Sequence, residues 1–169
     1  MIKQLHDFIY CPLCATTLVE TLIENKSRKV CPTDSCNYIF WNNPIPVVAA
    51  IVEHRGKILL AHNVDWPENF YAMITGFLEQ KESPEQAIIR EIKEELFLNA
   101  KIEAFIGHYP FKEMNQVLIC YWVKAIGEIK LNEELDSYKL ITMENISTYD
   151  FGPLYLAQQM IGDWIAMTK

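Results

Sequence analysis

Four of the five cysteines lie within the first 36 residues, in two pairs that constrain how this part of the chain can fold. Residues 11–14 read C-P-L-C and residues 31–36 read C-P-T-D-S-C, with sixteen residues between the pairs. Two thiolates on one tight turn can bind one metal ion, and two such turns complete a tetrahedral zinc site with four cysteine ligands. The spacing therefore predicts a small zinc ribbon whose structural Zn²⁺ is bound by Cys11, Cys14, Cys31 and Cys36.

Two other interpretations of the cysteine pairs are weaker. Paired disulfides suit a secreted chain, but residues 1–7 are too polar for a signal peptide. Buried free thiols rarely occur as two pairs that each begin with Cys-Pro. About forty residues bury too little apolar surface to fold alone, so the metal would supply the missing folding free energy. Residues 16–30 alternate as a hairpin does, and we place its tip at residues 25–27.

The charge balance limits the classes of partner. The chain has 15 Lys and Arg against 22 Asp and Glu, a net charge of −7, which argues against nonspecific binding to nucleic acid. Residues 1–40 hold four cations and four anions, so the ribbon has no basic face. No apolar run approaches the ~20 residues of a transmembrane helix. We expect a soluble cytoplasmic protein that binds neither nucleic acid nor membranes.

The rest of the chain mixes strands with two helices. Residues 41–46 read W-N-N-P-I-P, a turn-rich stretch, so we divide the chain into domains 1–41 and 42–169. The second helix is expected over residues 154–167, after Gly152-Pro153. Such a mixture predicts an α+β or α/β sandwich. Strands are expected over residues 47–52, 57–61, 71–74 (ended by Thr75-Gly76), 104–106 and 116–124. Cys120, in the last of these, is expected to be a small core residue.

The first helix has clear start signals. Ser83 is a good N-cap, Pro84 suits the first helical position, and Gln86 completes a capping box. An apolar stripe follows at helical spacing, formed by Ile88, Ile92 and Leu96.

Three carboxylates lie on one face of this helix, because Glu91, Glu94 and Glu95 are spaced i, i+3 and i+4. A solvated acidic face, partly neutralised by Arg90 and Lys93, is one interpretation. A site for Mg²⁺ or Mn²⁺ is the other, since these ions take a few carboxylates and keep water ligands. The triplet alone leaves both open.

The preceding loop decides between them. Residues 76–82 read G-F-L-E-Q-K-E and residues 90–98 read R-E-I-K-E-E-L-F-L. Together they resemble the signature of the Nudix hydrolases, G-x5-E-x7-R-E-U-x-E-E-x-G-U, in which U is bulky and apolar. Eight of the nine defined positions match across 23 residues. We expect the resemblance to extend from Pro46 to the C-terminus.

The one departure is Phe97, where the signature has glycine. That glycine ends the helix in a left-handed conformation, which costs other residues roughly 1 kcal/mol or more. Asn99 tolerates this conformation better than Phe97 does, so we expect the helix to end nearer Asn99.

The resemblance implies a fold and a reaction. The fold would be a Nudix-type α/β/α sandwich with a mixed sheet. The reaction would be hydrolysis of a nucleoside diphosphate linked to another group X, giving a nucleoside monophosphate and X-phosphate. By position, Glu91 and Glu95 resemble the principal Mg²⁺ or Mn²⁺ ligands, with Glu94 a third. The Thr75 carbonyl, just before Gly76, would also reach the metal.

The resemblance also implies roles in proton transfer and orientation. Arg90 would orient a loop carboxylate, Glu82 or Glu79, by an ion pair. The general base varies within this family and would be Glu95 or a residue of a later loop. Residues 132–136 read N-E-E-L-D, and Glu134 is our first choice in that loop, although a solvated turn explains it equally well.

Nudix domains preceded by a four-cysteine ribbon resemble the branch that contains the NADH pyrophosphatases. Those enzymes carry S-Q-P-W-P-F-P after the signature, whereas residues 106–112 here read I-G-H-Y-P-F-K. ADP-ribose, FAD and dinucleoside polyphosphates therefore rival NADH, and the substrate-binding residues are unknown. Phe70, Tyr109 and Phe111 could stack on a base, but such aromatic residues are more often core. A homodimer would fit the family, although no self-complementary apolar patch is visible.

A non-catalytic interpretation stays open beside this one. The chain could be a Nudix-like module that binds a nucleotide and acts through a partner. A lost carboxylate would mark such a module, and here the signature residues Glu82, Arg90, Glu91, Glu94 and Glu95 are all present.

Overall fold

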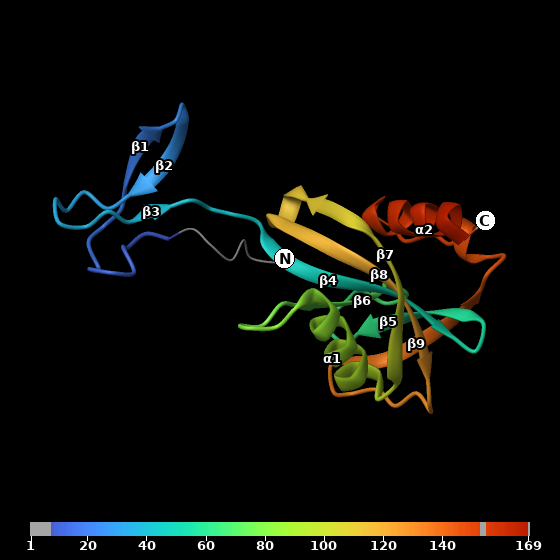
Figure 1. The fold of residues 1–169 in the computed structure, drawn as a ribbon. Helices are drawn as coiled ribbons and strands as arrows, with labels where there is room; N and C mark the ends of the chain where they lie inside the picture. The colour runs from blue at the N-terminus through green and yellow to red at the C-terminus, as the bar shows by residue number, and fades with distance from the viewer. Residues whose placement is uncertain (1–7, 153–154, 169) are drawn as a thin grey trace. The chain divides into compact units, whose positions relative to one another are not determined.

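The computed structural model describes residues 8–152 and 155–168 (Figure 1). The chain divides into two compact units, Met1–Pro44 and Ile45–Lys169, and each is described by itself. Among the described residues, no helix is long and apolar enough to cross a membrane.

The first unit is a three-stranded antiparallel sheet in the order β1-β2-β3. Its strands are β1 (Val19–Ile23), β2 (Lys26–Val30) and β3 (Ile39–Phe40). Ile23 pairs with Lys26, so the turn consists of Glu24 and Asn25 alone. Both have positive φ, which a two-residue hairpin turn requires. The expected tip at residues 25–27 was therefore wrong, because Lys26 and Ser27 already belong to β2.

The second unit is built on a six-stranded mixed sheet in the order β7-β8-β4-β5-β9, with β6 also paired to β4. The β4–β8 pair is parallel and the other pairs are antiparallel. The strands are β4 (Ile45–His54), β5 (Lys57–Asn63), β6 (Ile74–Phe77), β7 (Asn99–Phe111), β8 (Gln116–Ile126) and β9 (Leu135–Thr142).

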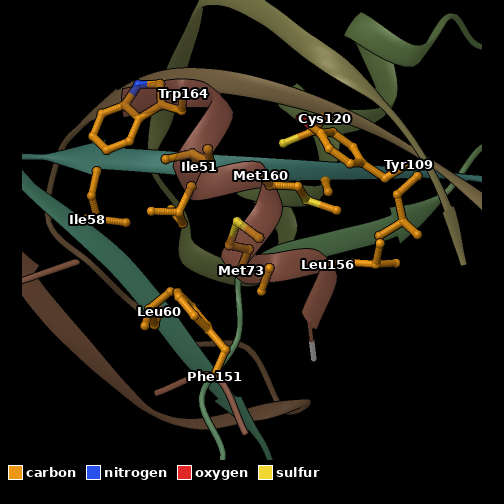
Figure 2. Close-up of a cluster of buried hydrophobic side chains, with 14 of the residues drawn as sticks. Ile51, Ile58, Leu60, Met73, Tyr109, Cys120, Phe151, Leu156, Met160 and Trp164 are labelled. Atoms are coloured by element: carbon orange, nitrogen blue, oxygen red, sulfur yellow. The ribbon is translucent and has the colours of Figure 1, made fainter. Parts of the chain in front are cut away.

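Two helices cover opposite faces of this sheet. Helix α1 (Pro84–Leu96) buries the predicted stripe of Ile88, Ile92 and Leu96 against one face. Helix α2 (Tyr155–Thr168) packs on the other, where Figure 2 shows Met160 and Trp164 among the side chains of the sheet. The faces separate because neighbouring β4 residues point to opposite sides, as strand geometry requires. The expected α/β/α sandwich with a mixed sheet is confirmed.

Several local predictions hold. Ser83, Pro84 and Gln86 form the predicted N-terminus of α1, with both hydrogen bonds of the capping box present. Cys120 is fully buried in the cluster under α2. Two short 3-10 helices, η1 (Lys112–Met114) and η2 (Ile146–Thr148), complete the unit. The expected start of the second helix at residue 154 lies outside the described residues.

The strand expected at residues 71–74 is displaced toward the C-terminus. β6 runs from Ile74 to Phe77, so Thr75 and Gly76 lie inside it rather than ending it. They pair with Ala49 and Val48 of β4. Glycine normally weakens a strand, but it is also used where another group approaches the backbone closely. The side chain of Glu91 makes such an approach.

The end of α1 also differs from the expectation. The helix ends at Leu96, and Phe97 itself takes the left-handed conformation, with φ 57° and ψ 18°. Its N–H donates to the Lys93 carbonyl at 3.1 Å. Leu98 is fully buried and β7 begins at Asn99, so the chain reverses at Phe97 despite the cost of the left-handed conformation. The helix therefore does not extend towards Asn99.

Replacing Phe97 with glycine is expected to raise the free energy of unfolding by about 1 kcal/mol, because glycine removes the left-handed strain. Phe97 is 50% exposed, so its replacement loses little buried apolar surface. Urea unfolding followed by tryptophan fluorescence would measure the change. Phe97→Ala is the control, since alanine removes the ring but keeps Cβ. Equal stabilisation by both variants would show that strain is not the cause.

Candidate active site

Arg90 connects the loop after β6 to the carboxylate face of α1. Its Nε and Nη2 donate to the two oxygens of Glu82 at 2.8 and 3.0 Å, a bidentate ion pair. Its Nη1 donates to Glu91 and Glu94 at 2.9 and 3.0 Å. The Arg90 hydrogen bonds hold the pKa of Glu82 below its ordinary value. Of the two expected partners, the structure brings the Glu82 carboxylate to Arg90.

The carboxylates of the helix face and of the loop before β9 converge on a cavity of about 420 Å³. Besides Arg90, the cavity is lined by Glu91, Glu94, Glu95, Glu134, Thr75, Gly76, Val47, Phe77 and Gln116. Most of the predicted signature residues and the chosen loop residue, Glu134, therefore share one cavity, whereas Glu82 is not among the described residues that line it. Val47, Phe77 and Gln116 were not anticipated from the sequence. Val47 and Gln116 join the site through the strand pairings of β4, which no local pattern shows.

Glu95 is the carboxylate with the most perturbed environment. Burial raises its pKa to about 8, and the negative charges of Glu91 and Glu134 add to the effect. Burial also raises the pKa of Glu91, although Arg90 opposes this. Within the described part of the chain, no cation forms an ion pair with Glu95. Ionising Glu95 among like charges is costly, so its charge is neutralised either by a proton or by a bound cation.

The cavity has the donor set of a hydrated divalent ion. Among the described residues, only the four cysteines have ligand atoms that all lie within 4.8 Å of one another. The glutamates do not form such a close group. Mg²⁺ keeps several of its waters and is usually held by one or two carboxylates together with substrate phosphates, so a closed cage of protein ligands is not required.

Gly76 leaves the space that the Glu91 side chain occupies. A Cβ at residue 76 would fall on the Glu91 carboxylate. Gly76 lies in β6 and Glu91 in α1, so the absence of a side chain lets the helix carboxylate lie directly against the strand.

Replacing Gly76 with alanine is expected to lower the free energy of unfolding by about 1–3 kcal/mol, the usual cost of overpacking. Either Glu91 must leave its place or β6 must shift from α1. Urea unfolding measures the loss. The matched control is Gly162→Ala in α2, where a Cβ would meet nothing within 4 Å. We expect Gly162→Ala to be neutral or stabilising. Equal stability of Gly76→Ala and the unmutated protein would contradict the steric argument.

The aromatic candidates for base stacking lie elsewhere. Tyr109 is buried in the cluster under α2, and its hydroxyl donates to Asp163 at 2.7 Å. Phe111 packs against the same cluster, while the Phe70 ring makes an edge contact with Trp66. None of these three aromatic residues is among the described residues that line the carboxylate cavity. Tyr109 is therefore a core residue.

The four N-terminal cysteines form a second cluster of ligands. Sγ of Cys11 lies 3.6 Å from that of Cys36, and Sγ of Cys14 lies 3.4 Å from that of Cys31, so none is in a disulfide. Zn–S bonds of about 2.3 Å in a tetrahedron place sulfurs about 3.8 Å apart, close to these distances. Hydrogen bonds with Thr16 and Cys31 lower the pKa of Cys14 to about 6, whereas burial and the neighbouring thiols raise the pKa of Cys36 to about 12, so without a metal the four sulfurs share their protons unequally. The cluster fits a zinc site with four cysteine ligands.

Comparison with known proteins identifies the second unit. A family model of the NUDIX domain matches residues 43–159. The chain belongs to the Nudix hydrolase family. A crystal structure of a NUDIX hydrolase from Nitrosomonas europaea has the same fold, with a TM-score of 0.78 and 22% identity, over 91% of this chain and 88% of that one.

Curated Nudix relatives resemble the chain at lower coverage. It is 28% identical over 127 residues to the mitochondrial NAD(P)H pyrophosphatase NUDT13 of Mus musculus, covering 72% of this chain and 36% of that protein. It is 29% identical over 131 residues to the NAD-capped RNA hydrolase NudC of Mannheimia succiniciproducens, covering 74% and 48%. It is 28% identical to the ADP-ribose pyrophosphatase of Methanocaldococcus jannaschii, covering 70% and 73%. The chain thus spans about a third to a half of the length of NUDT13 and NudC.

Proposed function

We propose that this Nudix protein hydrolyses a nucleoside diphosphate linked to a group X and releases a nucleoside monophosphate and X-phosphate. The observation that carries the proposal is the cavity in which Glu91, Glu94, Glu95 and Glu134 converge while Glu95 lacks a counter-ion among the described residues. On a fully solvated acidic face, partial burial would not raise the pKa of one carboxylate to about 8, as it does for Glu95.

The residues of the cavity would have different roles in such a reaction. Glu91, Glu94, Glu95 and the Thr75 carbonyl would hold Mg²⁺ or Mn²⁺. When bound, the metal would neutralise the pyrophosphate and lower the pKa of the attacking water. Arg90 keeps Glu91 and Glu94 in place by hydrogen bonds at 2.9 and 3.0 Å.

A carboxylate at the cavity wall would accept the proton of the attacking water. We assign this role to Glu134, because its side chain lines the cavity from the loop before β9 and makes no ion pair among the described residues. Glu95 is the other candidate. The Glu134→Gln variant distinguishes the two candidates, because this variant would keep most of its turnover if Glu95 were the base.

The first unit is proposed to bind structural zinc through Cys11, Cys14, Cys31 and Cys36. Among the described residues of this unit, the apolar cluster around these cysteines is small and consists of Leu18 with Tyr38 and Phe40 packed against it. So little buried apolar surface favours a metal as the main source of stability for this unit.

The three relatives narrow the substrate class. Their names specify NAD(P)H, an NAD cap and ADP-ribose, which share a pyrophosphate joined to a nucleoside. We therefore propose a dinucleotide or ADP-ribose-like substrate, with X left undetermined.

The test is a turnover screen with Mg²⁺ or Mn²⁺ in which products are identified by mass. The panel contains NADH, NAD, ADP-ribose, FAD, diadenosine polyphosphates and nucleoside triphosphates. AMP released from one dinucleotide would support the proposal and identify X. Full activity in excess EDTA would contradict the metal role. A folded, zinc-loaded protein that binds a nucleotide without hydrolysing it would instead support the non-catalytic binding module.

A further inference from the structure

The loop between β8 and β9 is bonded to the end of helix α1 by main-chain hydrogen bonds. The Lys130 N–H donates to the Leu96 carbonyl, and the Asn132 N–H donates to the Glu95 carbonyl, both at 3.1 Å. The last carbonyls of a helix have no partner within the helix itself. This loop supplies partners for two of them.

Asn132 makes a second contact, through its side chain, with Glu134 on its own loop. Its side-chain Oδ1 accepts a hydrogen bond from the Glu134 N–H at 3.1 Å. A side chain that accepts from the N–H two residues later closes a local turn, as asparagine often does. Asn132 thus contacts the main chain of both Glu95 and Glu134, whose side chains line the same cavity.

The far side of Glu134 is held as well. The Val64 N–H donates to the Glu134 carbonyl at 2.9 Å, which joins the loop to the end of β5. His62 of β5 lies 2.7 Å from Asp136 through Nδ1 and Oδ1. The backbone that carries Glu134 is therefore fixed from two elements, and on the α1 side the connection runs through Asn132.

We propose that Asn132 is a positioning residue for the hydrolysis, which holds the Glu134 carboxylate at a set place relative to the carboxylates of α1. This inference rests on the function proposed above, and in particular on Glu134 as the general base. Asn132 is not among the described residues that line the cavity, so the proposed effect is on Glu134 rather than on the substrate. Small displacements of a catalytic group reduce turnover steeply, even when binding is unchanged.

The test compares Asn132→Ala with Asn132→Ser, because serine keeps an oxygen acceptor and adds no charge. We expect Asn132→Ala to lower kcat by about 10–100-fold with little change in KM. Asn132→Ser should recover most of the loss. The matched control is Asp150→Ala. The Asp150 side chain accepts a hydrogen bond of the same kind, from the Gly152 N–H at 2.8 Å, and it lies far along the chain from this loop. Normal kcat in Asn132→Ala, or an equal loss in Asp150→Ala, would overturn the proposal.

A double-mutant cycle tests whether Asn132 acts through Glu134. In the Glu134→Gln background, adding Asn132→Ala should lower kcat no further, because the group being positioned is already absent. A full additional loss in the double variant would show that Asn132 acts by another route.

Amide hydrogen exchange separates this inference from the proposed function. The Glu134 amide should exchange faster in Asn132→Ala than in Asn132→Ser, whether or not any substrate is turned over. Faster exchange in a protein that hydrolyses nothing would refute the proposed function but would still show that the Asn132 side chain holds the Glu134 amide. Unchanged exchange in an active enzyme would refute the role of Asn132 alone.

Discussion

Replacing Glu95 with glutamine is expected to reduce turnover by about 10²–10⁴-fold while the fold is retained. Glutamine keeps the shape of the side chain but removes the charge that a divalent ion would bind. Mn²⁺ affinity, measured by electron paramagnetic resonance, should fall together with kcat. The control is Glu133→Gln, which removes an exposed charge close to Glu134; Glu133 is not among the described residues that line the cavity. Unchanged turnover in Glu95→Gln would refute the role given to this residue.

The metal-free protein provides a second measurement on Glu95. Its pKa is raised in the folded state to about 8 from an ordinary 4.5, so folding favours the protonated form. The contribution of Glu95 to stability is therefore full below pH 4.5 and is lost as the pH rises to about 8. In EDTA at about pH 8, Glu95→Gln should unfold at a higher temperature than the unmutated protein. A lower Tm would contradict the burial of an unpaired carboxylate.

Removing zinc is expected to unfold the first unit. Purified protein should contain near one zinc ion per chain, and Cys31→Ser should lose it. Structural zinc supplies about 10–16 kcal/mol in small zinc-binding peptides, more than a core of this size can replace. Metal analysis by mass spectrometry measures the zinc. Hydrogen exchange over residues 19–30 should then show that β1 and β2 lose protection.

The control for this experiment is the fifth cysteine. Cys120 lies in the core of the other unit, so Cys120→Ser should keep its zinc and the protection of β1 and β2. We expect the Nudix unit of Cys31→Ser to keep its own protection, because it has separate buried clusters on both faces of its sheet. A metal-free Cys31→Ser chain with intact protection at residues 19–30 would show that zinc is not required.

The sequence predicted what depends on local spacing. The capping box at Ser83, the apolar stripe of α1 and the two cysteine pairs all lie within short windows, and their geometry follows from helix and turn periodicity. The carboxylates of Glu91, Glu94 and Glu95 are placed by the same periodicity.

The errors arose where tertiary contacts override local preference. Gly76 ends a strand by propensity, yet here it continues β6 because it pairs with Val48 of β4, and its missing side chain leaves room for Glu91. Phe97 should avoid a left-handed conformation, yet it adopts one between two fully buried leucines, Leu96 and Leu98. Strand β9 was not anticipated, because its sequence, L-D-S-Y-K-L-I-T, contains no clear apolar run. The contacts of Asn132 depend on the chain returning to α1, which the sequence around it does not indicate.

The parallel pairing of β4 and β8 has a consequence for how the protein folds. It joins Ile45 to Gln116 and continues in register to His54 and Ala125, so each pair closes a loop of about seventy residues. Helix α1 and the loop after β6 lie inside that loop, whereas the β4–β5 and β7–β8 pairs are local. Contacts so distant in sequence form slowly, because chain entropy must be lost before they are made. The local hairpins should therefore form before the β4–β8 pair, and the carboxylate cavity, which Val47 and Gln116 help to line, should be complete only after that pair has formed.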